Sequence, residues 1–200
     1  MVQHFAAGVV LAAVAAELVP KIIQNEIQWL VALGFALGVL IMLITETFTD
    51  YLNEKMSGNK FPIGLVLAVI VDVFIDGLLI GVAFSASRRS GILVASALTL
   101  EVFFLGIATT ASLMKRNVKK SIGIACMIVA ALLIPIGAWL GFMVASGLLN
   151  AIHMTILAFG TAALIYLVIE ELLIEAHQVP ETRKATLAFF VGFLIILLIP

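Results

Sequence analysis

Long apolar blocks alternate with short polar breaks along the whole chain. We count seven blocks, covering residues 4–23, 27–49, 61–86, 90–114, 120–148, 151–176 and 184–200. A helix needs about 20 apolar residues to cross the hydrocarbon core of a bilayer. The blocks are long enough to span the membrane as helices. Because apolar and polar positions do not alternate within them, they predict membrane-spanning helices rather than strands.

The breaks between the blocks are short clusters of charged and turn-forming residues, the clearest at 53–60, 115–120 and 179–184. Short connections join antiparallel neighbours. We therefore predict an all-α fold, a polytopic transmembrane helix bundle of about seven spans that forms a single domain over residues 1–200. Small residues at helix-contact spacing, such as Gly77 and Gly81, predict close backbone packing within it.

The composition excludes an ordinary soluble domain. Of the 200 residues, 64% are hydrophobic and 12% are charged, whereas soluble domains are nearer to half apolar and about 25% charged. The net charge of −1 gives no sign of a nucleic-acid partner, so the expected surrounding is the lipid bilayer. Cys126 is the only cysteine, which excludes an internal disulfide and a cysteine-based metal site.

The basic residues are divided unequally if the blocks alternate across the bilayer. One side collects eight of them, Lys55, Lys60, Lys115, Arg116, Lys119, Lys120, Arg183 and Lys184, and the other side collects Lys21, Arg88 and Arg89. The positive-inside rule then predicts a cytoplasmic N-terminus and an outside C-terminus. We expect the membrane to be the cell membrane.

Several carboxylates lie within the apolar blocks. Asp72 and Asp76 are four residues apart in the third block, on one face of a helix, and Glu101 lies about equally deep in the fourth. Glu170 and Glu171 occupy the inner part of the sixth block. An acid at the bilayer centre costs at least about 2.5–3.5 kcal/mol, so such residues usually face a cavity, a partner or an ion.

No lysine or arginine lies in the middle of any block to neutralise these acids. The remaining choices are protonation with hydrogen bonding to a neighbouring helix, or a bound cation that favours the ionised form. For Asp72, Asp76 and Glu101 we favour the functional role. For Glu17, Glu46, Asp50 and Glu175, near block ends, we favour a structural role, because carboxylates there reach headgroup water.

The available ligand atoms restrict the ion. Carboxylate oxygens suit Mg²⁺, Ca²⁺, Mn²⁺ and ferrous iron, whereas zinc and copper sites usually include histidine or cysteine. The histidines His4, His153 and His177 all fall near block ends. We expect each of them to be an interfacial residue rather than a ligand.

This arrangement resembles the ZIP (Zrt/Irt-like) family of divalent metal transporters. The stretch 71–84, with Asp72, Asp76 and Gly77, is similar to the family's metal motif on its fourth helix, and Glu101 lies where the motif of the fifth helix is expected. The opening block resembles the family's second helix, and residues 160–177 resemble its late acidic helix. The resemblance implies a metal site at Asp72, Asp76 and Glu101, with Glu170 and Glu171 on the inner path, and a homodimer.

The chain also departs from that family. It lacks the histidine of the first motif and starts where the family's second helix would. We therefore expect a divergent member, a divalent cation transporter and not an enzyme, whose oxygen-rich site prefers a harder ion than the family's usual zinc. Two alternatives stay open: a proton-coupled carrier of a non-metal substrate, and a non-transporting membrane sensor or partner subunit.

Overall fold

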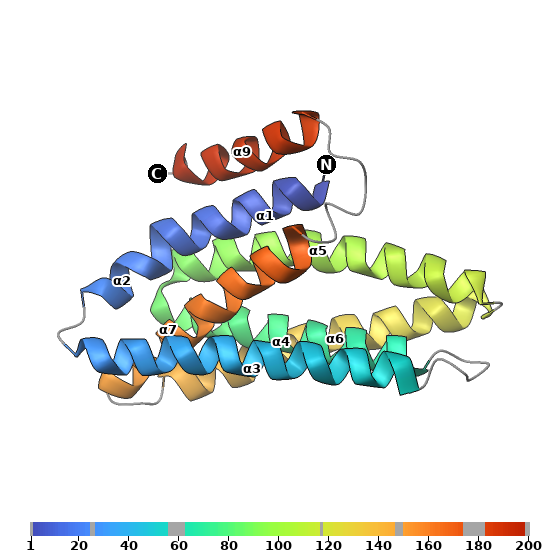
Figure 1. Cartoon of the computed structure of the whole chain (residues 1–200), viewed down its shortest axis with the longest axis horizontal. Helices are drawn as coiled ribbons and strands as arrows, with labels where there is room; N and C mark the ends of the chain where they lie inside the picture. Colours follow the sequence, from blue (N-terminus) through green and yellow to red (C-terminus); the bar gives the residue numbers. More distant parts are fainter. Residues whose placement is uncertain are drawn as a thin grey trace.

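The computed structural model of the chain is a bundle of helices (Figure 1). It describes residues 2–24, 27–55, 63–116, 118–146, 150–173 and 183–198, and within these ranges it contains no strand. In chain order the elements are α1 (Val2–Ala13), η1 (Val14–Leu18), α2 (Val19–Ile23), α3 (Gln28–Lys55), α4 (Ile63–Ala86), α5 (Arg88–Lys115), α6 (Lys120–Ser146), α7 (Asn150–Tyr166), η2 (Leu167–Leu172) and α9 (Arg183–Leu198). The segments η1 and η2 are π-helical turns that continue α1 and α7.

The predicted fold class is confirmed. Among the described residues, 6 helices are long and apolar enough to cross a membrane: His4–Ile23, Gln28–Tyr51, Ile63–Ala86, Arg88–Lys115, Lys120–Ser146 and Ile152–Glu170. They correspond to the first six predicted blocks. The seventh block contains α9, which is apolar but has only 16 helical residues. At 1.5 Å per residue that helix covers about 24 Å, less than the roughly 30 Å of a bilayer core.

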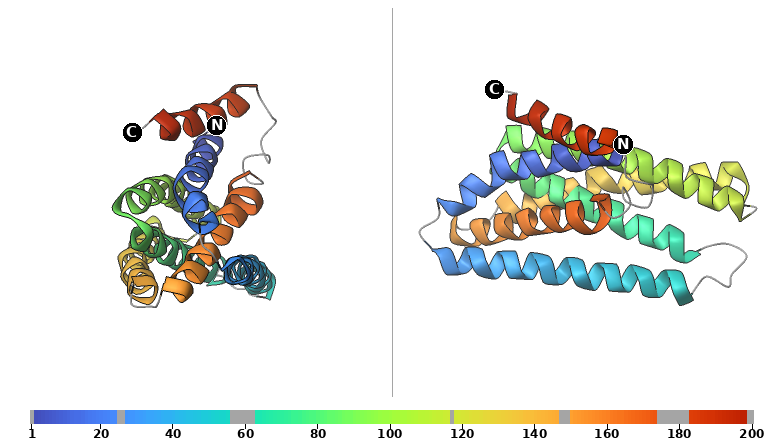
Figure 2. Two further views of the ribbon diagram at one scale, coloured as in Figure 1. Left: turned by 90° about the vertical axis from the view of Figure 1, so that its left-hand side faces the viewer. Right: turned by 45° about the horizontal axis from the view of Figure 1, so that its top comes forward.

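Successive long helices run in opposite directions along the bundle (Figures 1 and 2). One end, called here the basic end, carries Lys55, Lys115, Arg116, Lys119 and Lys120. The opposite end carries Lys21, Arg88 and Arg89. The alternation on which the predicted charge asymmetry depended is therefore present.

Glycines form the contacts of three helix pairs. A Cβ atom at Gly81 of α4 would lie 2.1 Å from the carbonyl oxygen of Ala138 in α6, and one at Gly141 of α6 would lie 2.2 Å from that of Leu78. Gly34 makes the same kind of contact between α3 and α7, as does Gly8 between α1 and α9. Since no larger residue fits at these distances, the predicted close packing by small residues is confirmed.

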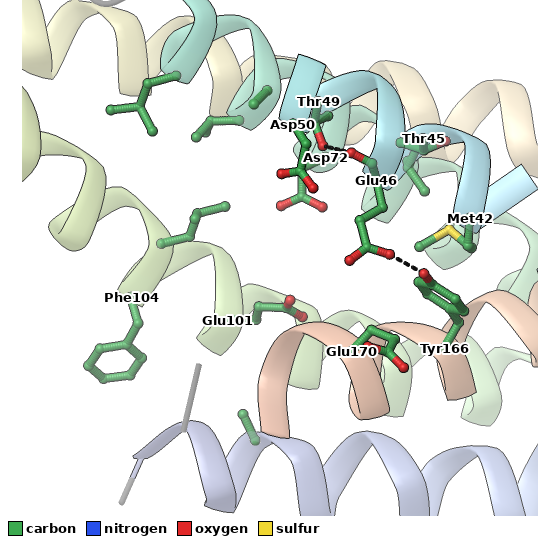
Figure 3. Close-up of a pocket in the computed structure, with 16 residues that line it drawn as sticks. Met42, Thr45, Glu46, Thr49, Asp50, Asp72, Glu101, Phe104, Tyr166 and Glu170 are labelled. Carbon is green, nitrogen blue, oxygen red and sulfur yellow. Dashed lines mark hydrogen bonds between the residues drawn. The ribbon is translucent and has the colours of Figure 1, made fainter. Parts of the chain in front are cut away.

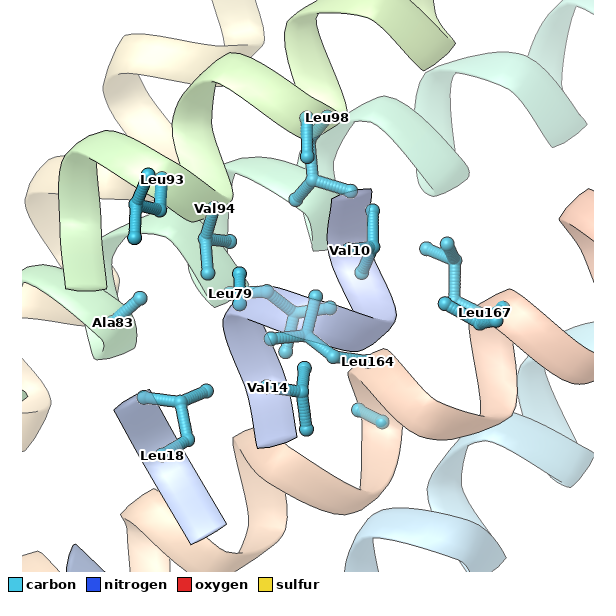
Figure 4. Packing of buried hydrophobic residues seen from close by; sticks show 14 of the residues in the cluster. Val10, Val14, Leu18, Leu79, Ala83, Leu93, Val94, Leu98, Leu164 and Leu167 are labelled. Atoms are coloured by element: carbon cyan, nitrogen blue, oxygen red, sulfur yellow. The ribbon is translucent and has the colours of Figure 1, made fainter. Parts of the chain in front are cut away.

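A hydrophobic core fills the space where the first span, α4, α5 and α7 meet (Figure 4). Its fully buried side chains include Val14, Leu18, Leu79, Leu98 and Leu164. In contrast, α3 and α6 lie at the outside of the bundle, and only 17% of the apolar window of each is buried. These two helices therefore present most of their surface to lipid.

Candidate functional site

A cavity of about 300 Å³ lies between α3, α4, α5 and the α7–η2 segment (Figure 3). Among the residues that the structure describes, five of those that line it are acidic, and no lysine or arginine lines it. These acids are Glu46, Asp50, Asp72, Glu101 and Glu170. The cavity therefore brings together carboxylates from four separate segments of the chain.

Three of the five predicted site residues line this cavity. Asp72 comes from α4, Glu101 from α5 and Glu170 from η2. Asp76, one turn beyond Asp72, is 0% exposed and does not line it. The side chain of Glu171 lies outside the described part of the structure. The sequence thus pointed to three acids, from α4, α5 and η2, that line one cavity. The spacing of Asp72 and Asp76 did not indicate which of these two residues lines it.

The other two cavity acids come from α3 and were expected to be structural. Glu46 and Asp50 are one helical turn apart, and the carboxylate of Glu46 accepts a hydrogen bond from the hydroxyl of Tyr166 (Figure 3). The neighbouring Thr49 also lines the cavity, but its hydroxyl donates to the carbonyl of Glu46 at 2.9 Å. Their four-residue spacing is the sequence signal that places both acids on one face of α3.

The cavity acids differ in exposure. Asp50 is exposed, Glu46, Asp72 and Glu170 are half-buried, and Glu101 is only 9% exposed. Because surrounding protein has a lower dielectric constant than water, the charge of a buried carboxylate such as Glu101 acts more strongly than that of an exposed one.

The cavity acids do not form a closed coordination shell. Nowhere in the described ranges do three or more histidine, cysteine, aspartate or glutamate side chains meet in a group that could hold a metal ion. The cavity walls therefore supply carboxylate oxygens on several sides of an open space. Such walls attract hydrated cations and supply hard oxygen ligands if the helices approach one another.

The opposite end of the bundle holds a polar network around Glu17. The carboxylate of Glu17 lies 2.9 Å from Nε of Arg89 and 3.9 Å from Nζ of Lys21, and it accepts a hydrogen bond of 3.2 Å from the hydroxyl of Ser90. Lys21 also donates to Ser87 and Ser90, at 2.9 and 2.8 Å. The network ties the first span to the turn between α4 and α5. This placement matches the structural role expected for Glu17.

Both π turns carry an acid of these two regions. Glu170 lies in η2 and Glu17 lies in η1. A π turn adds one residue to a helix and rotates the side chains that follow, and such turns often occur at functional sites. Here one of them places Glu170 on the cavity wall, and the other places Glu17 beside Arg89.

None of the described histidines lines the cavity. His4 is buried in α1 at 6% exposure, so its interfacial placement is not found. Nε2 of His153 lies 3.1 Å from the hydroxyl of Ser85 in α4. His177 and Glu175 lie outside the described residues. The cavity is thus lined by oxygen donors without imidazole.

Comparison with known protein families shows to which family the chain belongs. A family model described as ZIP Zinc transporter matches residues 56–200. The chain belongs to the ZIP family. It is thus an integral membrane protein of a family of metal transporters, and that family is not one of enzymes. No curated protein matches the chain.

The matched region of this ZIP protein contains three of the cavity acids, Asp72, Glu101 and Glu170. Glu46 and Asp50 precede it, as does Glu17. The suspected family membership is therefore confirmed. The acids of α3 are a feature that the structure adds to the family match.

Proposed function

We propose that this ZIP protein transports a divalent metal cation through the acidic cavity, with Asp72, Glu101 and Glu170 as the principal ligands. The observation that supports the proposal most is that carboxylates from four segments line one cavity, with no lysine or arginine among the described residues of its wall. Carboxylates in such a place need a cation or a proton. Asp76 and Glu171 stay predicted ligands, to be tested in the same assay.

The chemistry of the cavity favours a hard ion. Its charged and hydroxyl donors are all oxygen atoms, from acids, threonines and Tyr166. Oxygen donors suit Mg²⁺, Ca²⁺, Mn²⁺ and ferrous iron, and the lack of imidazole lowers the relative affinity for Zn²⁺. We therefore expect the preference for Zn²⁺ over Mn²⁺ or ferrous iron to be weaker here than at a site that contains imidazole.

The exposure of Asp50, which lies near the end of α3 at Lys55, suggests that the cavity opens toward the basic end. Under the positive-inside rule that end is cytoplasmic, in a cell membrane, and the Glu17 network faces outside. Transport then requires α4 and α5 to move against the first span, α3 and α7, as in alternating access around a site near the midplane. The exposed apolar surface of α3 is available to a second copy of this single-domain chain in a homodimer.

Metal-dependent thermal stabilisation of the detergent-purified protein tests the proposal. The melting temperature would be measured with Mg²⁺, Ca²⁺, Mn²⁺, Fe²⁺, Co²⁺, Zn²⁺ and Cd²⁺, since a ligand that binds only the folded state raises it. We expect a shift that is lost in Asp72→Asn and Glu101→Gln and kept in Glu17→Gln. Equal shifts in the wild type and the cavity variants would refute the site.

Two further measurements separate the alternatives. If pH alone produced a shift that depended on Asp72, the cavity would bind protons, and the proton-coupled carrier would replace the metal transporter. Uptake of the stabilising metal into proteoliposomes distinguishes a carrier from a sensor or partner subunit. We expect uptake that follows the same metal preference as the melting temperature.

A further inference from the structure

The polar network around Glu17 joins the two groups of helices that the proposed transport moves against each other. One group contains α4 and α5, together with α6, which packs on α4 through the glycine contacts described above. The other group contains the first span, α3, α7 and α9, with glycine contacts between α3 and α7 and between α1 and α9. Because each of these glycines lies against the backbone of the neighbouring helix, the helices of such a pair resist sliding past one another.

The first span reaches across this boundary with two side chains that are four residues apart. Glu17 contacts Arg89 and Ser90, and Lys21 donates to Ser87 and Ser90. These five residues are called here the polar latch. Ser87 is the N-cap of α5, and its hydroxyl oxygen accepts from the backbone N–H of Ser90 at 3.0 Å. The residues that hold Glu17 and Lys21 are therefore fixed to the start of α5 and move with that helix.

A second polar contact crosses the boundary at the same end of the bundle (Figure 1). Nε2 of His153, near the start of α7, lies 3.1 Å from the hydroxyl of Ser85, near the end of α4. Since this hydroxyl donates to the carbonyl of Val82 at 2.6 Å, its oxygen accepts from His153. The first span and α7 are thus both bonded to the α4–α5 turn, at the end opposite the basic end.

The charged latch residues are partly exposed, so water can replace their partners. The side chains of Arg89 and Lys21 are 46% and 31% exposed, and that of Glu17 is 13% exposed. Ion pairs between exposed groups are weak, because water solvates each charge when the pair separates. A fully buried pair would instead leave a costly isolated charge whenever it opened. The latch therefore has the strength of a reversible contact.

We propose that the polar latch closes the end of the bundle opposite the basic end, and that it opens when the cavity becomes accessible from that end. This inference rests on the proposed transport through the acidic cavity. In alternating access one side of the ion site is closed while the other side is open. The structure has the latch formed, and the exposed Asp50 supports an opening at the basic end. Glu17 and Arg89 then set the ratio of two states, while the cavity acids bind the ion.

Distances between spin labels test the latch without a transport assay. In a Cys126→Ala background, one pair of labels at Ile23 and Ile92 would span the latch end, and another pair at Tyr51 and Met114 would span the basic end. All four of these side chains are exposed. Double electron–electron resonance would measure both distance distributions in the reconstituted protein.

Reversal of one latch charge should shift both distributions. Glu17→Arg places a like charge beside Arg89 and Lys21, and we expect it to raise the ratio of longer to shorter distances at the latch end by about tenfold or more. The distance at the basic end should shorten correspondingly. Adding Arg89→Glu restores an opposite-charge pair and should return both distributions toward those of the wild type. Arg89→Gln should act in the same direction as Glu17→Arg but less strongly, and Arg88→Gln is its matched control.

Two results of this measurement would overturn the latch. One is that Glu17→Arg and Arg89→Gln leave both distributions unchanged. The other is that the latch end loosens without any change at the basic end, because a merely structural contact would behave in that way.

A chemical bridge across the latch tests its part in transport. Glu17→Cys and Arg89→Cys, joined by a bifunctional methanethiosulfonate in the Cys126→Ala background, should stop metal uptake into proteoliposomes, and a reductant should restore it. The metal-dependent melting shift should remain, since neither residue lines the cavity. Arg88→Cys with Ile92→Cys, bridged within α5, is the control and should keep its uptake.

The outcomes separate the latch from the proposed function. Uptake by the bridged protein at the rate of the control would overturn the latch while leaving the transporter intact. If the unbridged wild type showed neither a melting shift nor uptake with any metal, the proposed transport would be refuted, and the spin-label distances would still decide whether the latch holds two states apart.

Discussion

Carboxylates have very different neighbours in two regions of the bundle. Glu17, at the end opposite the basic end, is surrounded by Arg89, Lys21 and the hydroxyl of Ser90. Glu101 lines the acidic cavity with four further acids, and no lysine or arginine in the described part of the chain lines it. The first arrangement neutralises a buried charge with residues of the chain. In the second arrangement we propose that a cation or protons have this role.

This difference helps to separate structural acids from functional acids in a membrane protein. A buried carboxylate is costly, and basic partners that offset the cost also hold the helices together. Five acids line one cavity, and among the described residues no lysine or arginine lines it with them. This contrast is why we propose a scaffold role for Glu17 and a transport role for the cavity acids.

The largest effect should come from the cavity acids. Asp72→Asn or Glu101→Gln removes a proposed ligand, and we expect the affinity for the stabilising metal to fall by about tenfold or more, since even outer residues of metal sites cost that much. A titration of the melting temperature with metal measures this. Glu17→Gln is the control, and a similar loss of affinity in it would break the comparison.

The second effect concerns stability at Glu17. Glu17→Gln leaves the fully buried Ser90 and the cation of Arg89 with a weaker partner. We expect the free energy of unfolding to fall by about 1–3 kcal/mol, and nearer to the lower value because Arg89 is partly exposed to solvent. The metal affinity should not change. Thermal melting without metal measures it.

Arg89→Gln removes the same ion pair from the other side, and Arg88→Gln is its matched control. Arg88 is exposed beside Arg89 but makes no ion pair among the described residues. It should melt like the wild type. If Arg88→Gln and Arg89→Gln destabilised the protein equally, the contact with Glu17 would not be the cause.

Asp76 sharpens the comparison, because it is buried like a structural acid but belongs to the family-like stretch that contains Asp72. Its side chain is 0% exposed and lies outside the cavity wall. We expect Asp76→Asn to lower the metal affinity by less than about tenfold, and by less than Asp72→Asn does. The same melting titration decides this. An equal or larger loss would make Asp76 a principal ligand.

The smallest effect should be that of Tyr166→Phe. The substitution removes the hydroxyl that donates to Glu46, at a half-buried site where water can take its place. We expect a loss of about 0.5–1 kcal/mol of stability. Thermal melting in detergent measures it. A change larger than that of Glu17→Gln would show that the contact between α3 and α7 depends on this bond.

Hydropathy predicted the fold well, because a bilayer imposes one length and one secondary structure on every span. Six of the seven blocks agree with long apolar helices, with small differences at their ends. The seventh overlaps α9, whose 16 described helical residues are fewer than the about 20 that a span needs. Apolar composition alone does not fix where a helix begins or ends.

The candidate site was only partly predictable. Depth within a block identified Asp72 and Glu101, because an acid far from any block end has few structural explanations. The same criterion did not place Glu46 and Asp50 with them, because these two acids lie near the end of α3, and the structure shows that both line the cavity. It also could not find Arg89 as the partner of Glu17, since the two are joined only by the packing of distant helices. The depth of a residue within its apolar block can be read from neighbouring residues, whereas its contact partner depends on how distant helices pack.

The glycine contacts between α4 and α6 bear on how freely the sequence can vary. At Gly81 and Gly141 every amino-acid replacement adds at least one carbon atom where a backbone oxygen already lies within about 2.2 Å. At Gly106 the same replacement meets open space. Two glycines of one hairpin, Gly106 and Gly141, therefore have opposite mutational tolerance. A library of substitutions should be depleted at Gly81 and Gly141 and rich in survivors at Gly106, whichever ion the protein carries.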